Sequence, residues 1–443
     1  MSALARILLA RGVRVSGSDV KGSALLERLS AEGAEIKIGH RPENVGDATL
    51  VVVSSAISAA NVELVTARAR GIRVLTRGEL LAELVADRRL IAVAGTHGKT
   101  TTTAMIAAIL EAADLDPSVM IGGVRIDDET NARAGAGPWF VTESDESDGS
   151  FLHLRPTVAI VTNIENDHVV SDAAMAALVA QFETFAGRIP NDGLAIIGID
   201  NPTSASLASR LGGRVMTYGF ADRADVRAAD VRFAGLGSVF DVEVEGKALG
   251  TFRLQVPGEM NVQNALAALA TARALGIDAA TAARALEAFR GVHRRFEILA
   301  QSEHLIVVDD YAHHPTAVAA TIAAARRYHN GPIVVAFQPH RYTRTAYLAA
   351  NFGEALAAAD EVYLAPIYAA SEEPIDEVSE RSIGAVLERH HTPVRYVPCV
   401  EALAEEVRKN AKPGSLVLML GAGNITNAAH ALARAVVPST QPG

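Results

Sequence analysis

Cysteine is almost absent from this 443-residue chain, in which Cys399 stands alone, and aromatic residues make up only 5%. A lone cysteine excludes a disulfide scaffold and any zinc site built from cysteines. No apolar run reaches the roughly 20 residues that a membrane span needs, and the sequence contains no signal-peptide pattern. We therefore expect no membrane insertion and a cytoplasmic location.

Clustered positive charge is also missing. The formal net charge is −10, and no block of lysine and arginine interrupts the sequence. Because nucleic-acid binding needs a basic surface, we expect no nucleic-acid partner. The composition is otherwise globular, with 49% hydrophobic and 21% charged residues. A single core rarely grows past roughly 250–300 residues, so the length predicts more than one domain.

Alternating strand and helix patterns divide the chain into three blocks, 1–87, 88–292 and 293–443. Such alternation predicts α/β domains with mainly parallel sheets. In the first block we expect helices at 1–10 and 23–32 and strands at 13–15 and 50–53. In the second we expect strands at 139–142 and 157–162, an antiparallel patch at 239–244 and 250–256, and helices over 261–289. In the third we expect strands at 305–308, 333–337, 361–364 and 415–420.

The most informative segment is 95–102, which follows an apolar run at 90–94 and precedes a helical run at 104–110. This order of strand, glycine loop and helix is typical of a phosphate-binding loop. Two glycines let backbone N–H groups close around phosphate oxygens at a helix N-terminus. A plain glycine turn is the simpler alternative, but the context favours a nucleotide site.

Within this loop, Lys99 is placed to reach the β- and γ-phosphates, and the threonine that follows is placed to ligate Mg²⁺. Only Thr96 and His97 separate Gly95 from Gly98, which is a shorter gap than in the commonest pattern. The compact loop points away from generic small GTPases and kinases.

Four carboxylates lie within residues 143–148, directly after an expected strand. They repel one another unless cations or solvent intervene, and an exposed acidic turn is the simpler interpretation. At a strand end in a phosphate-loop domain the cluster also suits Mg²⁺, with Glu143 as the expected ligand. His168, beside Asp167 after the next strand, is either structural or a contact for a second metal.

Polar segments also follow two strands of the third block. The first contains the tandem histidines His313 and His314, which suggest zinc, but no third ligand has a suitable spacing and we expect no zinc site. The second contains Arg341 and Arg344. Their planar guanidinium groups suit a carboxylate or phosphate, although a solvated basic turn is the alternative.

Together these segments resemble the Mur ligase family, and the resemblance extends over almost the whole chain. The matching segments are 15–19, 53–57, 95–102, 143–152, 163–168, 258–264, 291–296, 309–316, 338–345 and 421–423. The resemblance implies a Rossmann-like N-terminal domain that binds a UDP-substrate (1–87), a central ATPase domain (88–292) and a Rossmann-like C-terminal domain that closes over it (293–443). This chain departs from the family pattern at two positions. Met260 stands where histidine is common, and Ala312 stands where glycine is usual.

The resemblance implies an ATP-dependent ligase. It would join the carboxylate of UDP-N-acetylmuramate to L-alanine through an acyl phosphate, releasing ADP and phosphate in peptidoglycan precursor synthesis. ATP and Mg²⁺ are the implied cofactors, and a monomer or weak homodimer is expected. Other Mur ligases carry a carbamylated lysine after the histidine region, but no lysine lies between Lys99 and Lys247.

The resemblance also implies roles for individual residues. The loop residues expected to contact ATP are Gly95, Thr96, His97, Gly98, Lys99, Thr100 and Thr101. Asn261 and Asn264 are expected on the adenine side, Arg295 on the phosphate side, and Asp309 or Asp310 at the ribose. The expected metal ligands are Thr100, Glu143 and His168. The expected substrate contacts are Ser18, Asp19, Ser54, Ser55, Tyr311, His314, His340, Arg341 and Arg344. Catalysis is expected to depend on Lys99, His168, Arg341 and Arg344.

The first block lacks the strand and glycine-rich turn that normally open a Rossmann-like domain. Either the domain begins with a helix, or its first strand belongs upstream of Met1. Because the turn would hold the UDP diphosphate, the sequence as given predicts weak binding of the UDP-substrate. The missing glycine fingerprint also argues against a dinucleotide-dependent oxidoreductase.

Two other functions stay open. One is the recycling ligase of the same family, which joins an intact tripeptide to UDP-N-acetylmuramate; the segment 338–345 favours the L-alanine enzyme. The other is a non-catalytic nucleotide-binding protein derived from a ligase, which would bind ATP without substrate-dependent phosphate release.

Overall fold

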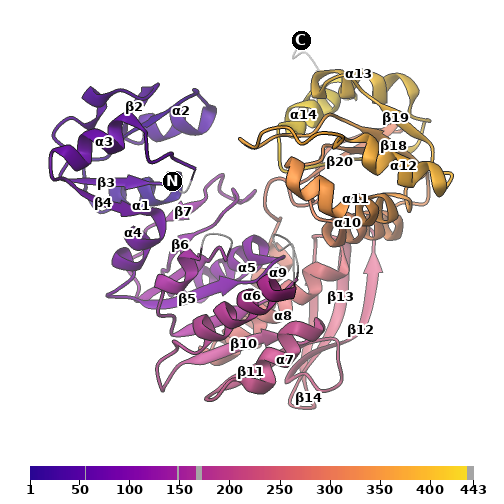
Figure 1. The fold of residues 1–443 in the computed structure, drawn as a ribbon. Coiled ribbons are helices and arrows are strands. Elements are labelled where there is room, and N and C mark those ends of the chain that lie inside the picture. Colours follow the sequence, from indigo (N-terminus) through magenta and orange to yellow (C-terminus); the bar gives the residue numbers. More distant parts are fainter. Residues whose placement is uncertain (55, 147–148, 166–171, 437–443) are drawn as a thin grey trace, which may run out of the picture.

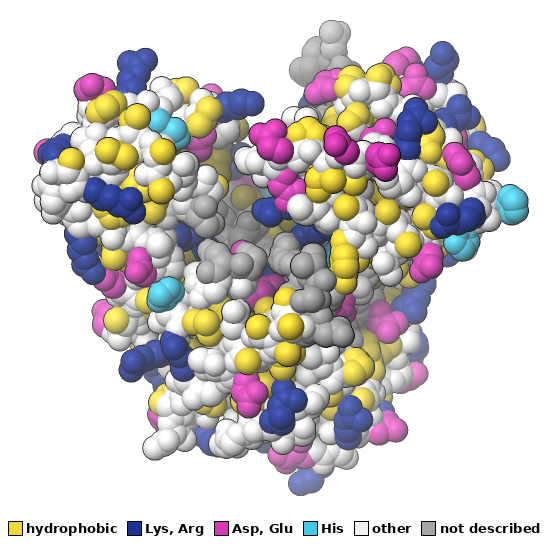
Figure 2. All heavy atoms as spheres, in the orientation of Figure 1, with side chains coloured by type: hydrophobic (Ala, Val, Ile, Leu, Met, Phe, Trp, Pro, Cys, Tyr) yellow, Lys and Arg dark blue, Asp and Glu magenta, His cyan; other side chains and the backbone are white. Residues whose placement is uncertain are grey.

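The computed structural model describes residues 1–54, 56–146, 149–165 and 172–436. An N-terminal lobe and a C-terminal lobe stand side by side above a central domain, and a deep notch separates the two lobes (Figures 1 and 2). No helix in the described part of the chain is both long and apolar enough to cross a bilayer. The three-part α/β architecture confirms the expected fold class, while the boundaries at 87/88 and 292/293 stay predictions.

The N-terminal lobe contains two separate parallel strand pairs. Strand β1 (Ser16–Asp19) pairs with β2 (Glu35–Ile38), and β3 (Leu50–Val53) pairs with β4 (Arg73–Thr76). Its helices are α1 (Ser2–Ala10), α2 (Ala24–Ala31), α3 (Val62–Ala69) and α4 (Arg77–Leu84), with a 3₁₀ turn η1 at Pro42–Val45.

The sequence predicts a strand that begins at 13–15 and ends in 16–19, and the structure forms only its second part, β1. Gly12 follows α1 with φ +76°, and Val13 is 46% exposed, so this apolar residue is not part of a buried strand. The pairing with β2 begins only at Ser16, opposite Glu35. Register, not local apolarity, sets where this strand starts.

The central domain contains a ten-stranded sheet in the order β14-β13-β12-β11-β10-β9-β5-β8-β6-β7. Pairing is parallel from β6 through β12, and the β6–β7, β12–β13 and β13–β14 pairs are antiparallel. The strands are β5 (Arg89–Ala94), β6 (Ser118–Met120), β7 (Ala132–Arg133), β8 (Trp139–Glu143), β9 (Val158–Val161), β10 (Leu194–Gly198), β11 (Val215–Gly219), β12 (Val226–Ala234), β13 (Gly237–Val244) and β14 (Lys247–Leu254). The helices are α5 (Lys99–Ala112), α6 (Asp172–Ala186), α7 (Pro202–Arg210), α8 (Glu259–Ala274) and α9 (Ala279–Ala288), with a 3₁₀ turn η2 at Ser150–His153.

Two apolar cores cover the two faces of this sheet. One contains buried residues of α5, α8 and α9, and the other contains buried residues of α6 and η2. Leu4 and Ile7 of α1 and Leu81 of α4 belong to this second core, together with Phe140 of β8. Part of the N-terminal lobe is therefore anchored on the central domain by buried apolar surface.

The C-terminal lobe contains a six-stranded sheet in the order β15-β16-β20-β17-β18-β19, antiparallel only at β15. The strands are β15 (Glu297–Gln301), β16 (Leu305–Asp310), β17 (Ile333–Phe337), β18 (Glu361–Leu364), β19 (Val394–Tyr396) and β20 (Ser415–Leu420). The helices are α10 (Pro315–Tyr328), α11 (Tyr342–Leu356), α12 (Arg381–Arg389), α13 (Val400–Asn410) and α14 (Ile425–Val436). Every residue of β16 and β20 is buried, as expected for central strands of a parallel sheet.

The two sheets each bring several polar segments to one edge. In the central sheet β5 pairs in parallel with both β8 and β9, so the segments after these three strands leave at the same edge. In the C-terminal sheet β20 lies between β16 and β17 in the same direction. Ligands of open α/β sheets bind beyond the carboxyl ends of such strands.

Candidate active site

The loop between β5 and α5 contains two glycines that no other residue can replace without strain. Gly98 caps α5 with φ +84°, and a Cβ there would lie 2.5 Å from Oδ1 of Asn264. At Gly95, φ is +130° and a Cβ would lie 2.1 Å from Oγ1 of Thr162. Only glycine fits both the backbone conformation and the space. The N-terminus of α5 thus carries a tight backbone cradle of the kind that holds phosphate.

Residues that follow β9 hold this loop in shape. The His97 N–H donates to Oδ1 of Asn163 at 2.9 Å, and Nδ2 of Asn163 donates back to the His97 carbonyl at 3.1 Å. Oγ1 of Thr162 donates to the same carbonyl at 2.6 Å, and the Glu165 N–H donates to Oγ1 of Thr96 at 2.8 Å. The loop is therefore preorganised by its own domain. The sequence analysis assigned Asn163 no individual role, although its position after a neighbouring strand was a usable signal.

Lys99 lies folded over this loop. Its Nζ donates to the Gly95 carbonyl at 2.5 Å and to the two carboxylate oxygens of Glu146 at 2.9 and 3.1 Å. Burial raises the pKa of Glu146, and the nearby Lys99 ammonium opposes that rise. Sequence analysis placed Glu146 in an acidic cluster for Mg²⁺, but its carboxylate forms an ion pair with Lys99 instead.

Thr100 and Glu143 form a second polar contact at the start of α5. Oγ1 of Thr100 donates to Oε2 of Glu143 at 2.7 Å, and Nη2 of Arg295 donates to Oγ1 of Thr100 at 3.3 Å. A Cβ at Gly122 would lie 1.8 Å from Oε1 of Glu143, so the chain leaves room for this carboxylate. A hydroxyl beside a carboxylate is an oxygen donor set that suits Mg²⁺. The third expected ligand, His168, lies outside the described residues.

A buried chain of amides connects this helix to α8. Oγ1 of Thr102 donates to Oδ1 of Asn264 at 3.1 Å, Nδ2 of Asn264 donates to Oδ1 of Asn261 at 3.0 Å, and Nδ2 of Asn261 donates to the Pro257 carbonyl at 2.7 Å. These bonds fix both asparagines next to the loop. Thr101 is also buried in α5. The adenine-side role of the asparagines stays a prediction.

Two aspartates end β16, and both are buried. Asp310 accepts hydrogen bonds from the N–H groups of Phe296 and Ala312, each at 2.7 Å. Burial raises its pKa to about 6, although the nearby Arg295 opposes this. Asp309 accepts from Oγ1 of Thr426 at 2.6 Å, and burial raises its pKa as well. Asp310 thus fixes the turns on either side of it, while the ribose role of either residue stays a prediction.

Two arginines of the C-terminal lobe pack against the ring of Tyr311. The guanidinium carbons of Arg294 and Arg295 each lie 4.9 Å from the centre of the Tyr311 ring, an arrangement that cation–π attraction stabilises. Nη2 of Arg294 also donates to the carbonyl of Gly421 at 2.7 Å. Sequence reasoning named Arg295 but missed Arg294, its neighbour in the chain.

The segment after β17 carries the other expected substrate contacts. The His340 ring stacks on Tyr368 with centroids 5.5 Å apart, and Nη1 of Arg344 lies 3.5 Å from Nδ1 of His340. Arg344 is buried, whereas the Arg341 side chain is 46% exposed and lies 3.8 Å from Glu372. Arg341 caps α11 with φ +73°, an uncommon conformation for a non-glycine residue and a frequent mark of functional sites.

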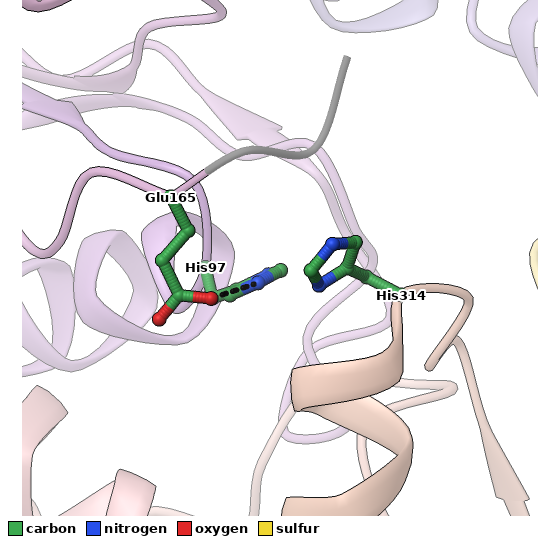
Figure 3. Close-up of side chains that lie close together, drawn as sticks. All are labelled: His97, Glu165 and His314. Carbon is green, nitrogen blue, oxygen red and sulfur yellow. Dashed lines mark ion pairs between the residues drawn. The ribbon is translucent and has the colours of Figure 1, made fainter. Parts of the chain in front are cut away.

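His314 meets the phosphate loop from the other lobe. It caps α10, and its ring centroid lies 5.1 Å from that of His97 (Figure 3). On the far side of His97, Nε2 lies 3.4 Å from Oε2 of Glu165. Burial would raise the pKa of Glu165, but His97, Thr316 and His314 together outweigh this effect and lower that pKa. The phosphate loop, the segment that follows β9 and the C-terminal lobe therefore meet at these three side chains.

The expected N-terminal contacts lie at the strand ends of their own lobe. Oγ of Ser18 donates to Oε2 of Glu63 at 2.6 Å, Asp19 accepts from the Lys21 N–H at 3.1 Å, and Ser54 accepts from the Ala56 N–H at 3.2 Å. These bonds are local to that lobe. Ser55 lies outside the described residues, and contact with substrate stays a prediction for all four serine and aspartate positions.

Comparison with protein families covers nearly the whole chain. The models described as "Mur ligase family, catalytic domain", "Mur ligase middle domain" and "Mur ligase, glutamate ligase domain" match residues 1–89, 93–272 and 294–423. Among curated relatives, the UDP-N-acetylmuramate–L-alanine ligases of Rhizobium meliloti (strain 1021) and Agrobacterium fabrum are each 44% identical over 440 residues. Each alignment covers 98% of this chain and 93% of the relative.

Solved structures show the same architecture. The UDP-N-acetylmuramate–alanine ligase MurC from Thermotoga maritima superposes with a TM-score of 0.84 at 30% identity, covering 98% of this chain and 95% of that one. A murein peptide ligase from Psychrobacter arcticus superposes with a TM-score of 0.74 at 25% identity, covering 100% and 97%. Sequence motifs, three-part fold and full-length similarity agree, and the chain belongs to the Mur ligase family.

Proposed function

We propose that this protein joins the carboxylate of UDP-N-acetylmuramate to the amino group of L-alanine at the expense of ATP. The observation that carries the proposal is the 44% identity to UDP-N-acetylmuramate–L-alanine ligases along 98% of the chain, a range that includes the N-terminal lobe, the central domain and the C-terminal lobe. A place in peptidoglycan precursor synthesis, in the cytoplasm and as a monomer or weak homodimer, belongs to the same proposal. So do the domain boundaries 1–87, 88–292 and 293–443.

The reaction needs activation because a carboxylate does not acylate an amine in water, oxide being a poor leaving group. Transfer of the γ-phosphoryl group of ATP to the carboxylate gives an acyl phosphate and ADP. The amine of L-alanine then attacks the acyl carbon, phosphate leaves, and a proton is lost from nitrogen. Enzymes accelerate such phosphoryl transfer mainly by positioning and by neutralising charge.

The residues of the loop suit the first step. Lys99 exchanges the Glu146 carboxylate for phosphate oxygens, and the backbone of Gly95–Gly98 receives the phosphate chain. Thr100 and Glu143, with His168, would hold Mg²⁺, which when bound offsets the negative charge of the phosphates. Arg295 donates to Thr100 from the C-terminal side and adds positive charge at the same point.

The C-terminal lobe supplies the second step. Arg344 and Arg341 bind the carboxylate of the incoming amino acid, and Tyr311, His314 and His340 line its approach. Ser18, Asp19, Ser54 and Ser55 bind the UDP end of the other substrate. Closure of the lobes over the central domain excludes water, which would otherwise hydrolyse the acyl phosphate.

One assay tests the proposal. Phosphate release by the full chain should require ATP, Mg²⁺, UDP-N-acetylmuramate and L-alanine together, and omission of any one should abolish it. Release with L-alanyl-γ-D-glutamyl-meso-diaminopimelate in place of L-alanine would identify a recycling ligase instead, the activity named for a solved structure from Neisseria meningitides. ATP binding with no substrate-dependent release would identify a non-catalytic nucleotide-binding protein.

A further inference from the structure

We propose that His97, Glu165 and His314 form a binding site for a zinc-class divalent metal ion that ties the phosphate loop to the C-terminal lobe (Figure 3). This site goes beyond the ligase activity and is separate from the Thr100–Glu143 pair proposed for Mg²⁺. Chain spacing alone argued against zinc at the tandem histidines, because the two further ligands come from other parts of the fold.

The spacing of the donor atoms fits a tetrahedral ion. One ligand atom of each residue lies within 4.8 Å of the other two. Ligands bound to zinc at about 2.0–2.2 Å and at tetrahedral angles lie about 3.3–3.6 Å apart. The 3.4 Å between Nε2 of His97 and Oε2 of Glu165 already has this value. A shift of His314 by about 1–1.5 Å would complete the set at that ligand spacing.

The donor types favour zinc over magnesium. Two imidazoles and one carboxylate make a mixed nitrogen and oxygen set, which suits Zn²⁺ and its neighbours among the transition metals. Mg²⁺ instead prefers oxygen ligands in an octahedral arrangement. Outside its contact with Glu165, Nε2 of His97 is buried and has no hydrogen-bond partner among the described residues. A metal ion would satisfy this atom.

Two of the three ligands are already fixed in place. The main chain of His97 is held on both sides by Asn163, and the Glu165 N–H is bound to Thr96. The third ligand, His314, begins α10 in the other lobe. An ion bound here would therefore connect the central domain to the C-terminal lobe, with a fourth coordination position open to water or to a phosphate oxygen.

Metal binding by the untagged full chain, without nucleotide or Mg²⁺, tests this proposal. Zn²⁺ is titrated calorimetrically, and Co²⁺ is titrated as a coloured probe whose visible absorption reports four-coordinate geometry. We expect one tight equivalent with such an absorption. His314→Gln should weaken binding at least 10-fold, as should Glu165→Gln, and both should lose the Co²⁺ spectrum.

Two matched variants keep the result interpretable. His313→Gln changes the neighbouring histidine, whose Nδ1 contacts the Tyr311 carbonyl, and it should bind Zn²⁺ like the wild type. Glu143→Gln alters the proposed Mg²⁺ ligands and should also bind Zn²⁺ normally. Retained tight binding in folded His314→Gln, or no tight equivalent in the wild type, overturns the proposal. Melting curves identify any variant that is unfolded. If one of His314→Gln and Glu165→Gln is unfolded, Zn²⁺ binding by the other, folded variant tests the proposal. None of these readouts depends on ligase activity.

Discussion

The two halves of the site are built differently. The loop half, which comprises residues 95–100 with Glu143, Glu146 and Asn163, lies in the central domain and is bonded mainly within it. The C-terminal half, which comprises Tyr311, His314, His340, Arg341 and Arg344, leaves two different strands of another sheet. The two halves meet through the Arg295–Thr100 hydrogen bond and the His97–His314 ring contact.

The phosphate site is therefore preformed, whereas the site for the second step depends on how the C-terminal lobe meets the central domain. Variants of the loop half should therefore damage ATP binding and turnover together. Variants of the C-terminal half should damage turnover and spare ATP binding.

The largest effect is expected for Lys99→Met, which removes the ammonium and keeps the length of the side chain. Loss of one preorganised cationic donor should lower turnover by about 100- to 1,000-fold, with weaker ATP binding. Phosphate release and calorimetric ATP titration measure the two effects. Lys247→Met on the exposed end of β14 is the control and should behave like the wild type. Normal turnover in Lys99→Met would end the proposed role of the loop.

Asp310→Asn should change how stability depends on pH. Burial raises the pKa of Asp310 from its ordinary value of 3.8 to about 6, so the folded protein binds this proton more tightly than the unfolded chain. The wild type therefore loses about 3 kcal/mol of unfolding free energy from this group as the pH rises from about 4 to about 6.

Urea unfolding at several pH values checks this. The stability difference, wild type minus Asp310→Asn, should be most favourable to the wild type near pH 4 and should shrink as the pH rises through 6. Asp222→Asn, which removes an aspartate with 97% side-chain exposure, is the matched control for loss of a carboxylate. A flat difference for Asp310→Asn would mean that this carboxylate ionises as easily as a surface one.

Arg344→Gln should separate the two halves most directly. Loss of a charged hydrogen-bonding partner of the amino-acid carboxylate costs about 1.5–3 kcal/mol, which corresponds to a roughly 10- to 150-fold fall in turnover. Since Arg344 lies in the C-terminal half, the Kd for ATP should change by less than about twofold, within the spread of an indirect effect. Arg389→Gln, at the exposed end of α12, is the control. If Arg344→Gln weakened ATP binding as much as Lys99→Met, the two halves would not be separable.

Gly98→Ala should give the smallest effect, and Gly12→Ala is its matched control. Both glycines have similar positive φ values, +84° and +76°, so both alanines carry comparable backbone strain. Only at Gly98 would the new Cβ collide, 2.5 Å from Oδ1 of Asn264, while nothing lies within 4 Å at Gly12. We expect Gly98→Ala to cost about 1–2 kcal/mol more than Gly12→Ala in urea unfolding and to weaken ATP binding. Equal costs would show that the amide chain yields without penalty.

Much of the fold could be predicted because apolar runs determine which segments are buried. Strands β3, β17, β18 and β20 have the predicted bounds, and the antiparallel β13–β14 pair follows the predicted alternation. The polar strand β1, with the sequence Ser-Gly-Ser-Asp, could not be placed the same way. Its position depends on pairing with β2 and not on its own residues.

Parts of the candidate site could likewise be predicted from the sequence, and other parts could not. The order of strand, glycine loop and helix, and the polar residues after strands β5, β8, β9, β16 and β17, follow from the sequence because chain connectivity carries them to sheet edges. The phosphate loop and the two polar sheet edges could therefore be read from the sequence. The contact of Glu146 with Lys99 and the meeting of His97, Glu165 and His314 became visible in the folded chain. Contacts between such distant segments depend on how sheets and lobes pack, which no local pattern encodes.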